Sequence, residues 1–163
     1  MKRDLKSDLP SLAVWLLITF AAGALGAVAT SQAPEFYQGL MQPSWAPPSW
    51  LFGPVWSTLY VLMGIAVWLV WRSREAASGH GPYVLYVVQL VANALWSWIF
   101  FAWHRGQWAF IEVLVLLALI IATMFSFARI NRSAAWLLAP YAAWTAFASL
   151  LTYTVWQLNP DLL

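Results

Sequence analysis

The side chains that could do chemistry in this chain are few, and most of them are aromatic. The sequence has no cysteine, two histidines and six acidic residues, against thirteen tryptophans, six tyrosines and nine phenylalanines. Without cysteine, disulfides, thiolate catalysis and cysteine-ligated zinc or iron–sulfur sites are excluded. His80 falls in a loop and His104 at the end of an apolar segment, so neither histidine is placed to ligate a haem iron inside a helix bundle.

The acidic residues are also poorly arranged for catalysis. No two carboxylates share an apolar segment, which argues against paired acid–base catalysis and against oxygen-ligand metal sites. Glu112 is the one charged side chain inside such a segment, and a buried carboxylate in a membrane is by default a functional hypothesis. Because Glu112 lies only four residues after Trp108, we expect instead that it is solvated at the interface or pairs with Arg105. Ordinary hydrolytic, metal and thiol catalysis are not expected, and no metal ligand is assigned.

The polar groups within the apolar segments follow single helical faces. Gln89, Asn93 and Ser97 recur every four residues, so they stack on one side of a helix, with Trp96 adjoining. Two similar faces combine Gly53, Trp56, Ser57, Tyr60 and Gly64 in one segment, and Tyr141, Trp144, Thr145, Ala148 and Thr152 in another.

These three faces have two interpretations. Interhelical hydrogen bonds in membranes contribute about 0.6 kcal/mol each, and we assign that role to Ser57, Ser97 and Thr145. The large aromatic side chains and the amides exceed what such bonds require, and they match a ligand pocket with apolar walls and a few placed polar groups. Aromatic packing without a ligand is the alternative.

The composition identifies the environment in which these faces must work. The chain has 163 residues, of which 63% are hydrophobic and 9% charged, and its mean hydropathy is +0.70. A soluble domain carries about 25% charged residues, so the soluble globular class is excluded. The net charge of +2 is too small and too dispersed for a nucleic-acid partner. The partner that the composition predicts is a lipid bilayer.

The predicted fold is all-α: a polytopic five-transmembrane-helix bundle forming one domain over residues 1–163. Five windows reach the length of about 20 apolar residues that a span needs, and β-barrel strands would be shorter and alternating. Pro140 should kink or tighten the last span. Two pairs of small residues that permit close helix approach are Ala22 with Gly26 and Gly23 with Ala27. The predicted spans are 11–30, 50–71, 82–103, 108–128 and 136–158, with a long first loop at 31–49.

The basic residues predict the orientation in the cell membrane. The one Lys or Arg on the other side is Arg105, and by the positive-inside rule the N-terminus is cytoplasmic. The first loop and the C-terminus then face outside. The seven cationic residues on the cytoplasmic side are Lys2, Arg3, Lys6, Arg72, Arg74, Arg129 and Arg132.

The end of the first loop carries the most specific pattern in the chain. Four prolines and two tryptophans fall within the twelve residues 43–54, and proline pre-orders the backbone, so we expect a stiff loop whose aromatics fold over the mouth of the bundle. The full pattern is Pro43-x-Trp45-x-Pro47-Pro48-x-Trp50-x-Phe52-x-Pro54-x-Trp56-x-x-Leu59-Tyr60-x-x-Met63-Gly64.

Together with two later patterns, this stretch resembles the translocator protein family, also called TspO/MBR or tryptophan-rich sensory proteins. The later patterns are Gln89-x-x-x-Asn93-x-x-Trp96-Ser97 with Phe100-Phe101, and Pro140-Tyr141-x-x-Trp144-x-x-Phe147-Ala148 ending in Trp156-x-Leu158-Asn159. The resemblance covers nearly the whole chain, and it points to a bacterial-type member.

The resemblance implies a five-helix bundle, commonly a homodimer, with a pocket that opens toward the first loop. The family binds tetrapyrroles such as protoporphyrin IX and haem as ligands, and no cofactor is required. Its bacterial members are proposed to break down porphyrin in light through two pocket tryptophans, which would be Trp56 and Trp144 here. By position in the motifs, the implied ligand-binding residues are Trp45, Trp50, Trp56, Tyr60, Asn93, Trp96, Trp144 and Ala148.

Two departures from the family pattern bear on the ligand. Most members have Asn where this chain has Thr152, so one amide contact near Trp156 is lost. The sterol motif of animal members needs Lys or Arg shortly after Tyr153, and Thr, Val, Trp, Gln and Leu follow instead. That departure argues against specific sterol binding.

Three functions follow from these patterns. The first is a membrane receptor, sensor or carrier for tetrapyrroles and related hydrophobic ligands. The second is a light-dependent porphyrin-degrading enzyme, in which Trp56 and Trp144 would be the catalytic residues. The third is a structural scaffold whose aromatics only pack. Saturable quenching of tryptophan fluorescence by protoporphyrin IX separates the third from the others, and product analysis after illumination separates the first two.

The predicted orientation is tested by labelling a single cysteine, since the chain has none of its own. An impermeant thiol reagent applied to intact cells or spheroplasts should label Gln38→Cys in the first loop and should not label Ser73→Cys. Labelling of Ser73→Cys with protection of Gln38→Cys would reverse the orientation.

Overall fold

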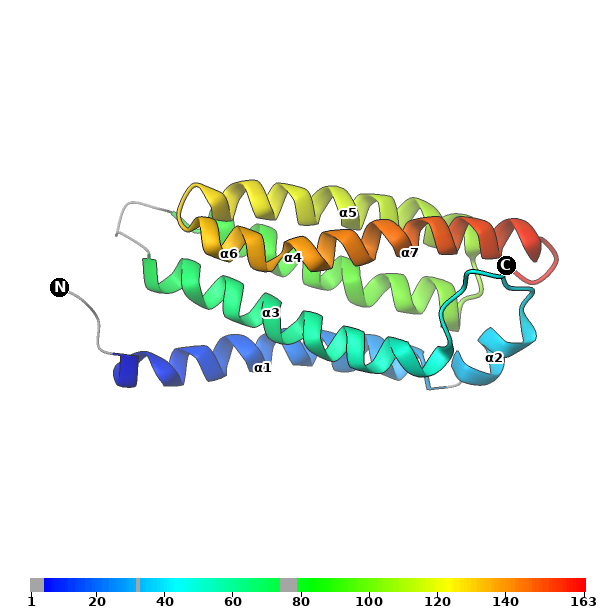
Figure 1. The fold of residues 1–163 in the computed structure, drawn as a ribbon, viewed down its shortest axis with the longest axis horizontal. Coiled ribbons are helices and arrows are strands. Elements are labelled where there is room, and N and C mark those ends of the chain that lie inside the picture. The colour runs from blue at the N-terminus through cyan, green and yellow to red at the C-terminus, as the bar shows by residue number, and fades with distance from the viewer. Residues whose placement is uncertain (1–4, 32, 74–78) are drawn as a thin grey trace.

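The chain folds into an elongated bundle of long helices (Figure 1). The computed structural model describes residues 5–31, 33–73 and 79–163, and this part of the chain contains no strand. The elements, in order, are α1 (Leu5–Ala29), α2 (Ala33–Gly39), η1 (Ser49–Leu51), α3 (Phe52–Ser73), α4 (Gly81–Ser97), η2 (Trp98–Ala102), α5 (Gly106–Ala128), α6 (Arg132–Leu137) and α7 (Ala139–Leu158).

Five helical segments are long and apolar enough to cross a membrane, which confirms the predicted fold class. Their bounds lie within four residues of the predicted spans, and they are Asp8–Ala29, Ser49–Ser73, Gly81–Ala102, Gly106–Ala128 and Arg132–Leu158. The first loop and the C-terminus lie at one end of the bundle, and the start of α1 lies at the other (Figure 1). Which end is cytoplasmic stays a prediction. Four of the cationic residues on which this prediction rests are not fully described by the structure: Lys2, Arg3 and Arg74 lie outside the described residues, and so does the side chain of Lys6.

The last span is interrupted next to Pro140, where the sequence predicted a kink or a tightened turn. α6 ends at Leu137 and α7 begins at Ala139, directly before Pro140. Because proline has no N–H to donate and its ring crowds the preceding turn, the helix tightens here, and Leu138 N donates to Ala135 O at 3.1 Å.

The end of α4 widens into a π-helical turn that we did not predict. Trp103 N donates to Trp98 O at 2.9 Å, five residues back instead of four. His104 follows with a left-handed φ of 51°, which ends the helix and turns the chain toward α5. An apolar run such as residues 98–102 reads equally well as ordinary α-helix, so the sequence gives no signal for this turn.

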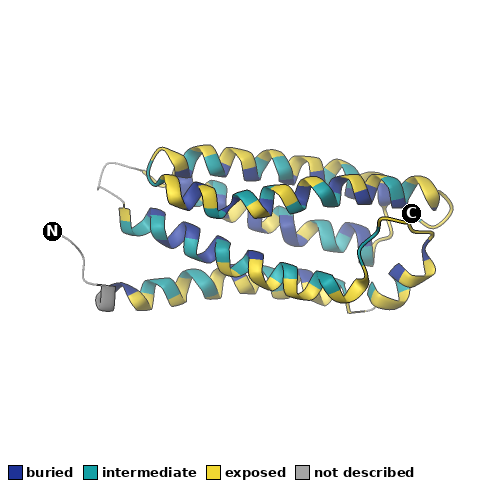
Figure 2. Cartoon of the chain, viewed as in Figure 1, coloured by how far each residue is buried: buried dark blue, intermediate teal, exposed yellow. Residues whose placement is uncertain are grey.

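The small residues of α1, whose packing partner the sequence left open, lie against other helices of the same chain. A methyl group at Gly23 would lie 2.6 Å from the ring of Tyr60 on α3, and one at Gly26 would lie 3.7 Å from the Cα of Ala94 on α4. α1 can therefore approach both neighbours closely, although much of its surface remains exposed (Figure 2). That exposed surface is apolar and suited to lipid.

The first loop is fixed to the C-terminal end of α7 by one amide. Asn159 accepts a hydrogen bond from Met41 N at 2.8 Å and donates to Met41 O at 2.9 Å. The same Nδ2 donates to Val155 O at 2.8 Å. Asn159 is buried, so these bonds hold the loop against this end of the bundle.

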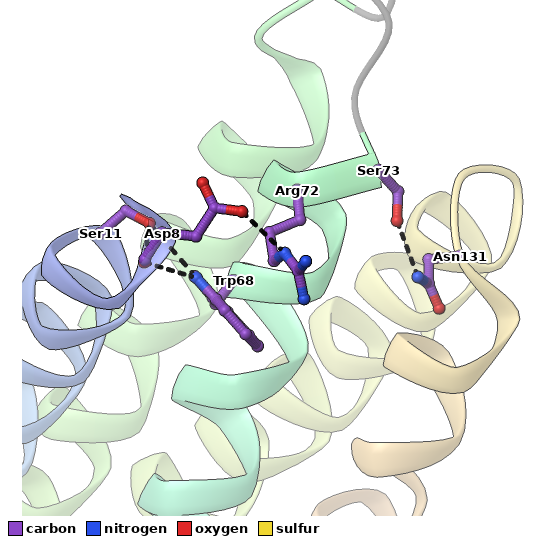
Figure 3. Close-up of polar contacts among 6 residues, drawn as sticks. All are labelled: Asp8, Ser11, Trp68, Arg72, Ser73 and Asn131. Atoms are coloured by element: carbon purple, nitrogen blue, oxygen red, sulfur yellow. Dashed lines mark hydrogen bonds and ion pairs between the residues drawn. The ribbon is translucent and has the colours of Figure 1, made fainter. Parts of the chain in front are cut away.

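At the opposite end, one polar cluster joins α1 to α3 (Figure 3). Asp8 Oδ2 lies 3.0 Å from Arg72 Nε, the one ion pair in the described part of the chain, and the Asp8 side chain is 4% exposed against 26% for Arg72. Trp68 Nε1 donates to Asp8 O and to Ser11 Oγ, both at 3.2 Å, and the Arg72 guanidinium lies 4.8 Å from the Trp68 ring centre.

This cluster predicts the effect of Arg72→Met on stability. The substitution leaves the Asp8 carboxylate buried without its partner, and breaking a fully buried pair costs about 3–5 kcal/mol. Because Arg72 is partly exposed, we expect a loss of about 2 kcal/mol in the free energy of unfolding, measured by chemical denaturation in detergent.

The matched control is Ser73→Ala, which removes the bond from Asn131 Nδ2 to Ser73 Oγ, 2.8 Å long and exposed. It should cost less than about 1 kcal/mol. Equal losses in the two variants would contradict a structural role for the Asp8 cluster.

Candidate ligand-binding cavity

A cavity of about 510 Å³ lies at the end of the bundle that the first loop covers. Ligand pockets measure about 300–1,000 Å³, so this one has room for a small organic molecule. Phe20, Gly53 and Ser57 line it and are also exposed, which shows that it opens to the surface between α1 and α3. The lining comprises Phe20, Gly23, Ala24, Gly26 and Ala27 of α1; Thr30; Ala33, Pro34 and Tyr37 of α2; Ser49; Phe52, Gly53, Trp56, Ser57 and Tyr60 of α3; Asn93, Trp96 and Ser97 of α4; Phe100 and Phe101; and Trp144, Ala148, Leu151, Thr152 and Val155 of α7.

Six of the eight site residues implied by the sequence resemblance lie together in this lining: Trp56, Tyr60, Asn93, Trp96, Trp144 and Ala148. The two loop tryptophans do not line the cavity. Trp45 is 48% exposed and packs edge-on against Phe147 at 5.9 Å, while Trp50 is 70% exposed. Neither side chain therefore contributes to the cavity lining, although we had expected the loop aromatics to fold over its mouth.

The cavity walls are aromatic rings in close contact with one another. Trp56 lies 5.6 Å from Tyr60, with 31° between the ring planes. Trp96 stacks on Phe100 at 5.5 Å and 11°. Trp144 meets Phe52 edge-on at 5.9 Å. Because each ring is held by another ring, the walls present fixed flat surfaces, and such surfaces favour a planar apolar ligand.

The inner wall is a chain of hydrogen bonds through Asn93. Tyr60 Oη donates to Asn93 Oδ1 at 2.8 Å, and Asn93 Nδ2 donates to Tyr141 Oη at 3.1 Å. Tyr141 Oη in turn donates to Gln89 Oε1 at 3.0 Å. Gln89 and Asn93 are 1% and 4% exposed, which confirms that their stripe faces the bundle. The network joins α3, α4 and α7.

Two of the three hydroxyl groups that we assigned to interhelical hydrogen bonds, those of Ser57 and Thr145, do not make them among the described residues. Ser57 Oγ donates to Gly53 O of its own helix at 2.9 Å. Thr145 Oγ1 is buried and has no hydrogen-bond partner among the described residues. The interhelical hydrogen bonds in this region come from longer side chains, since tyrosine and amide groups can reach across the space that large aromatics hold open.

Of the two expectations for Glu112, the pair with Arg105 is not found, whereas the side chain is only partly buried, as solvation at the interface requires. No ion pair with Arg105 is present in the described part of the chain, and Glu112 Oε2 is buried without a hydrogen-bond partner there. Arg105 is exposed, beyond the start of α5 at Gly106. The separation of Arg105 and Glu112 in the sequence would allow an ion pair on one helical face. However, α5 begins only after Arg105, so the two residues do not share that helix.

Sequence reasoning missed the contributions of α1 and α2 to the cavity. Tyr37 comes from the short helix α2, within a segment that we read entirely as loop. A signal was present, because Pro34 and Glu35 stand at its start and Gly39 at its end, the usual order of helix start and stop residues. Within the described residues, no group of three or more histidine or acidic side chains could hold a metal ion.

The sequence pattern of the TspO/MBR family matches residues 15–157. The chain is 38% identical over 155 residues to "Tryptophan-rich protein TspO" of Chlorobaculum tepidum, which covers 92% of this chain and 96% of the relative. It is 40% identical over 127 residues to "Translocator protein" of Homo sapiens, and this match covers 77% of this chain and 75% of the relative. It is 36% identical over 148 residues to "Tryptophan-rich sensory protein" of Cereibacter sphaeroides, and this match covers 88% of this chain and 91% of the relative.

The Asn93 network predicts unequal effects of two tyrosine substitutions. Tyr141→Phe leaves Asn93 Nδ2 and Gln89 Oε1 buried without partners, and we expect a loss of about 2 kcal/mol in the free energy of unfolding. Tyr60→Phe removes only the bond to Asn93 Oδ1, which lies at the cavity wall where water can replace the tyrosine hydroxyl. We therefore expect this variant to lose about 1 kcal/mol or less in the free energy of unfolding.

Denaturation in one detergent compares both variants with Tyr153→Phe, an exposed tyrosine outside this cavity. A loss for Tyr141→Phe no larger than that of Tyr153→Phe would contradict a stabilising role for the network.

Proposed function

Because this chain belongs to the TspO/MBR family, we propose that it is a membrane receptor, sensor or carrier that binds tetrapyrroles such as protoporphyrin IX or haem. That the chain is a multi-pass membrane protein follows from its family and its five spanning helices. The observation that carries the ligand proposal is the aromatic cavity, in which Trp56 and Trp144 stand on α3 and α7.

The walls of this cavity suit a flat conjugated macrocycle. Such a ligand gains most from large apolar contact with ring faces and edges, and Trp56, Tyr60 and Trp144 supply both. The polar inner wall at Asn93 is already satisfied by tyrosines, so this wall demands no hydrogen bond from the ligand. A planar, mostly apolar body is therefore the ligand shape that the walls favour.

The route of entry supports a role at the membrane. Asn159 fixes the loop over the end of the bundle, whereas the opening at Phe20, Gly53 and Ser57 lies between two spanning helices. We propose that a hydrophobic ligand enters from the lipid through this opening. Relatives named as sensory and translocator proteins support either sensing or carriage, and homodimer formation stays a prediction.

Light-dependent porphyrin breakdown is the second candidate, and one observation favours it. Trp56 and Trp144 both line the cavity, so a bound porphyrin would have two oxidisable indoles within the same space. Excited porphyrin would supply the driving force, and no acid–base residue is needed.

The proposed function predicts that Trp56→Phe and Trp144→Phe each weaken protoporphyrin IX binding about tenfold, or by 1–2 kcal/mol, because each variant loses indole contact area. Both keep an apolar ring, so the bundle should still fold. The measurement is a titration of intrinsic fluorescence in nanodiscs, repeated under illumination with analysis of products.

Trp15→Phe is the control, because Trp15 stacks on Tyr83 at 5.5 Å and does not line the cavity. It should bind like the parent. Parent-like binding in both Trp56→Phe and Trp144→Phe would contradict the cavity as the binding site. Loss of illumination products at saturating ligand would support the enzymatic alternative.

A further inference from the structure

One buried hydroxyl in the cavity lining is left unused by the fold. Thr152 of α7 lines the cavity and is 3% exposed, and its side chain makes no hydrogen bond among the described residues. The Thr152 hydroxyl is not one of the unpartnered polar atoms that their neighbours enclose completely. It therefore keeps a small accessible surface, and the place of this residue in the lining opens that surface to the cavity.

The neighbouring hydroxyls on α7 show which bond Thr152 does not make. Ser149 Oγ donates to Thr145 O at 2.8 Å, and Thr154 Oγ1 donates to Leu150 O at 2.9 Å. A bond to the carbonyl four residues back is the usual choice of serine and threonine inside a helix. Since Thr152 makes no such bond, its hydroxyl is free to bind a group inside the cavity.

The other hydroxyls of the lining are already bonded, enclosed or more exposed. Tyr37 Oη is buried among its neighbours, whereas Ser49 and Ser97 belong to residues that are more exposed than Thr152. Thr152 therefore carries the free hydroxyl on the buried part of the wall. The lining residues whose hydroxyls donate within the chain are Thr30, Ser57 and Tyr60.

The surroundings of Thr152 specify the kind of group that its hydroxyl can bind. Its neighbours in the lining on α7 are Ala148, Leu151 and Val155, all of them apolar. A charged group would give up its hydration here for one neutral hydrogen bond, which is costly. A neutral hydroxyl or carbonyl loses less, and it is matched in either direction because threonine can both donate and accept.

We propose that Thr152 Oγ1 binds a neutral oxygen substituent, a hydroxyl or a carbonyl, at the edge of the bound ring system. Thr152 is then a specificity-determining residue, which favours ligands whose edge carries such an oxygen over ligands with a hydrocarbon group in its place. This inference rests on the proposed tetrapyrrole function and adds to it the recognition of one substituent.

The test compares two macrocycles that share one ring system and the same two carboxylates. Haematoporphyrin IX carries two hydroxyethyl groups where mesoporphyrin IX carries ethyl groups. Thr152→Val replaces the hydroxyl with a methyl group of similar size, so the dissociation constant for haematoporphyrin IX should rise about fivefold. The constant for mesoporphyrin IX should change less than about twofold. Both constants are measured by fluorescence titration in nanodiscs.

Two further variants provide the controls. Thr154→Val removes a hydroxyl that bonds to its own helix outside the cavity lining, so it should change neither constant. Thr152→Ser keeps the hydroxyl and should keep the parent's ratio of the two constants. Should Thr152→Val fail to fold, Thr152→Ala carries the same comparison, because packing lost for both ligands cancels in that ratio.

The outcomes separate this inference from the proposed function. If the parent binds both macrocycles and Thr152→Val changes the two constants equally or not at all, the inference is wrong and the proposed function stands. If the parent binds neither macrocycle, the proposed function fails, and the inference fails with it.

Discussion

The fold depends on the requirement that a polar group placed in hydrocarbon must find its partner within the chain. Asn93 meets this requirement with both ends of one amide, since its oxygen accepts from Tyr60 and its nitrogen donates to Tyr141. The three helices that carry these residues are thereby held in one register. A one-turn slip of any of them would leave an amide unpaired in lipid, which fixes the height at which the aromatic side chains meet.

The cavity follows from the size of the residues at that height. On the loop side of Asn93, α3, α4 and α7 present tryptophans, and rings that brace one another cannot collapse into the space between them. Gly23 and Gly26 let α1 lie directly against this region, and Asn159 holds the loop over its end. On the other side, Tyr86, Met63 and Phe127 fill the interior and are fully buried. One half of the bundle is therefore packed throughout, and the other half holds a cavity of about 510 Å³ beside its own buried apolar cluster.

Most of this arrangement could be predicted from the sequence, because apolar length and four-residue spacing are local signals. They located five spans and placed Gln89, Asn93, Trp56 and Trp144 on inward faces. What could not be predicted depends on long-range contact or subtle backbone change. The π-helical turn at residues 98–102 has no sequence signature, and the position of Trp45 outside the cavity lining depends on its packing against Phe147.

The proposed function places a planar tetrapyrrole in the cavity at the loop end of the bundle. A structure of the protein in nanodiscs with protoporphyrin IX tests it most directly. One macrocycle per chain is expected within the cavity, in contact with Trp56 and Trp144. A macrocycle found only in the surface groove between α5 and α7, which Phe110, Leu114 and Tyr153 line, with the cavity itself free of ligand, would contradict the account.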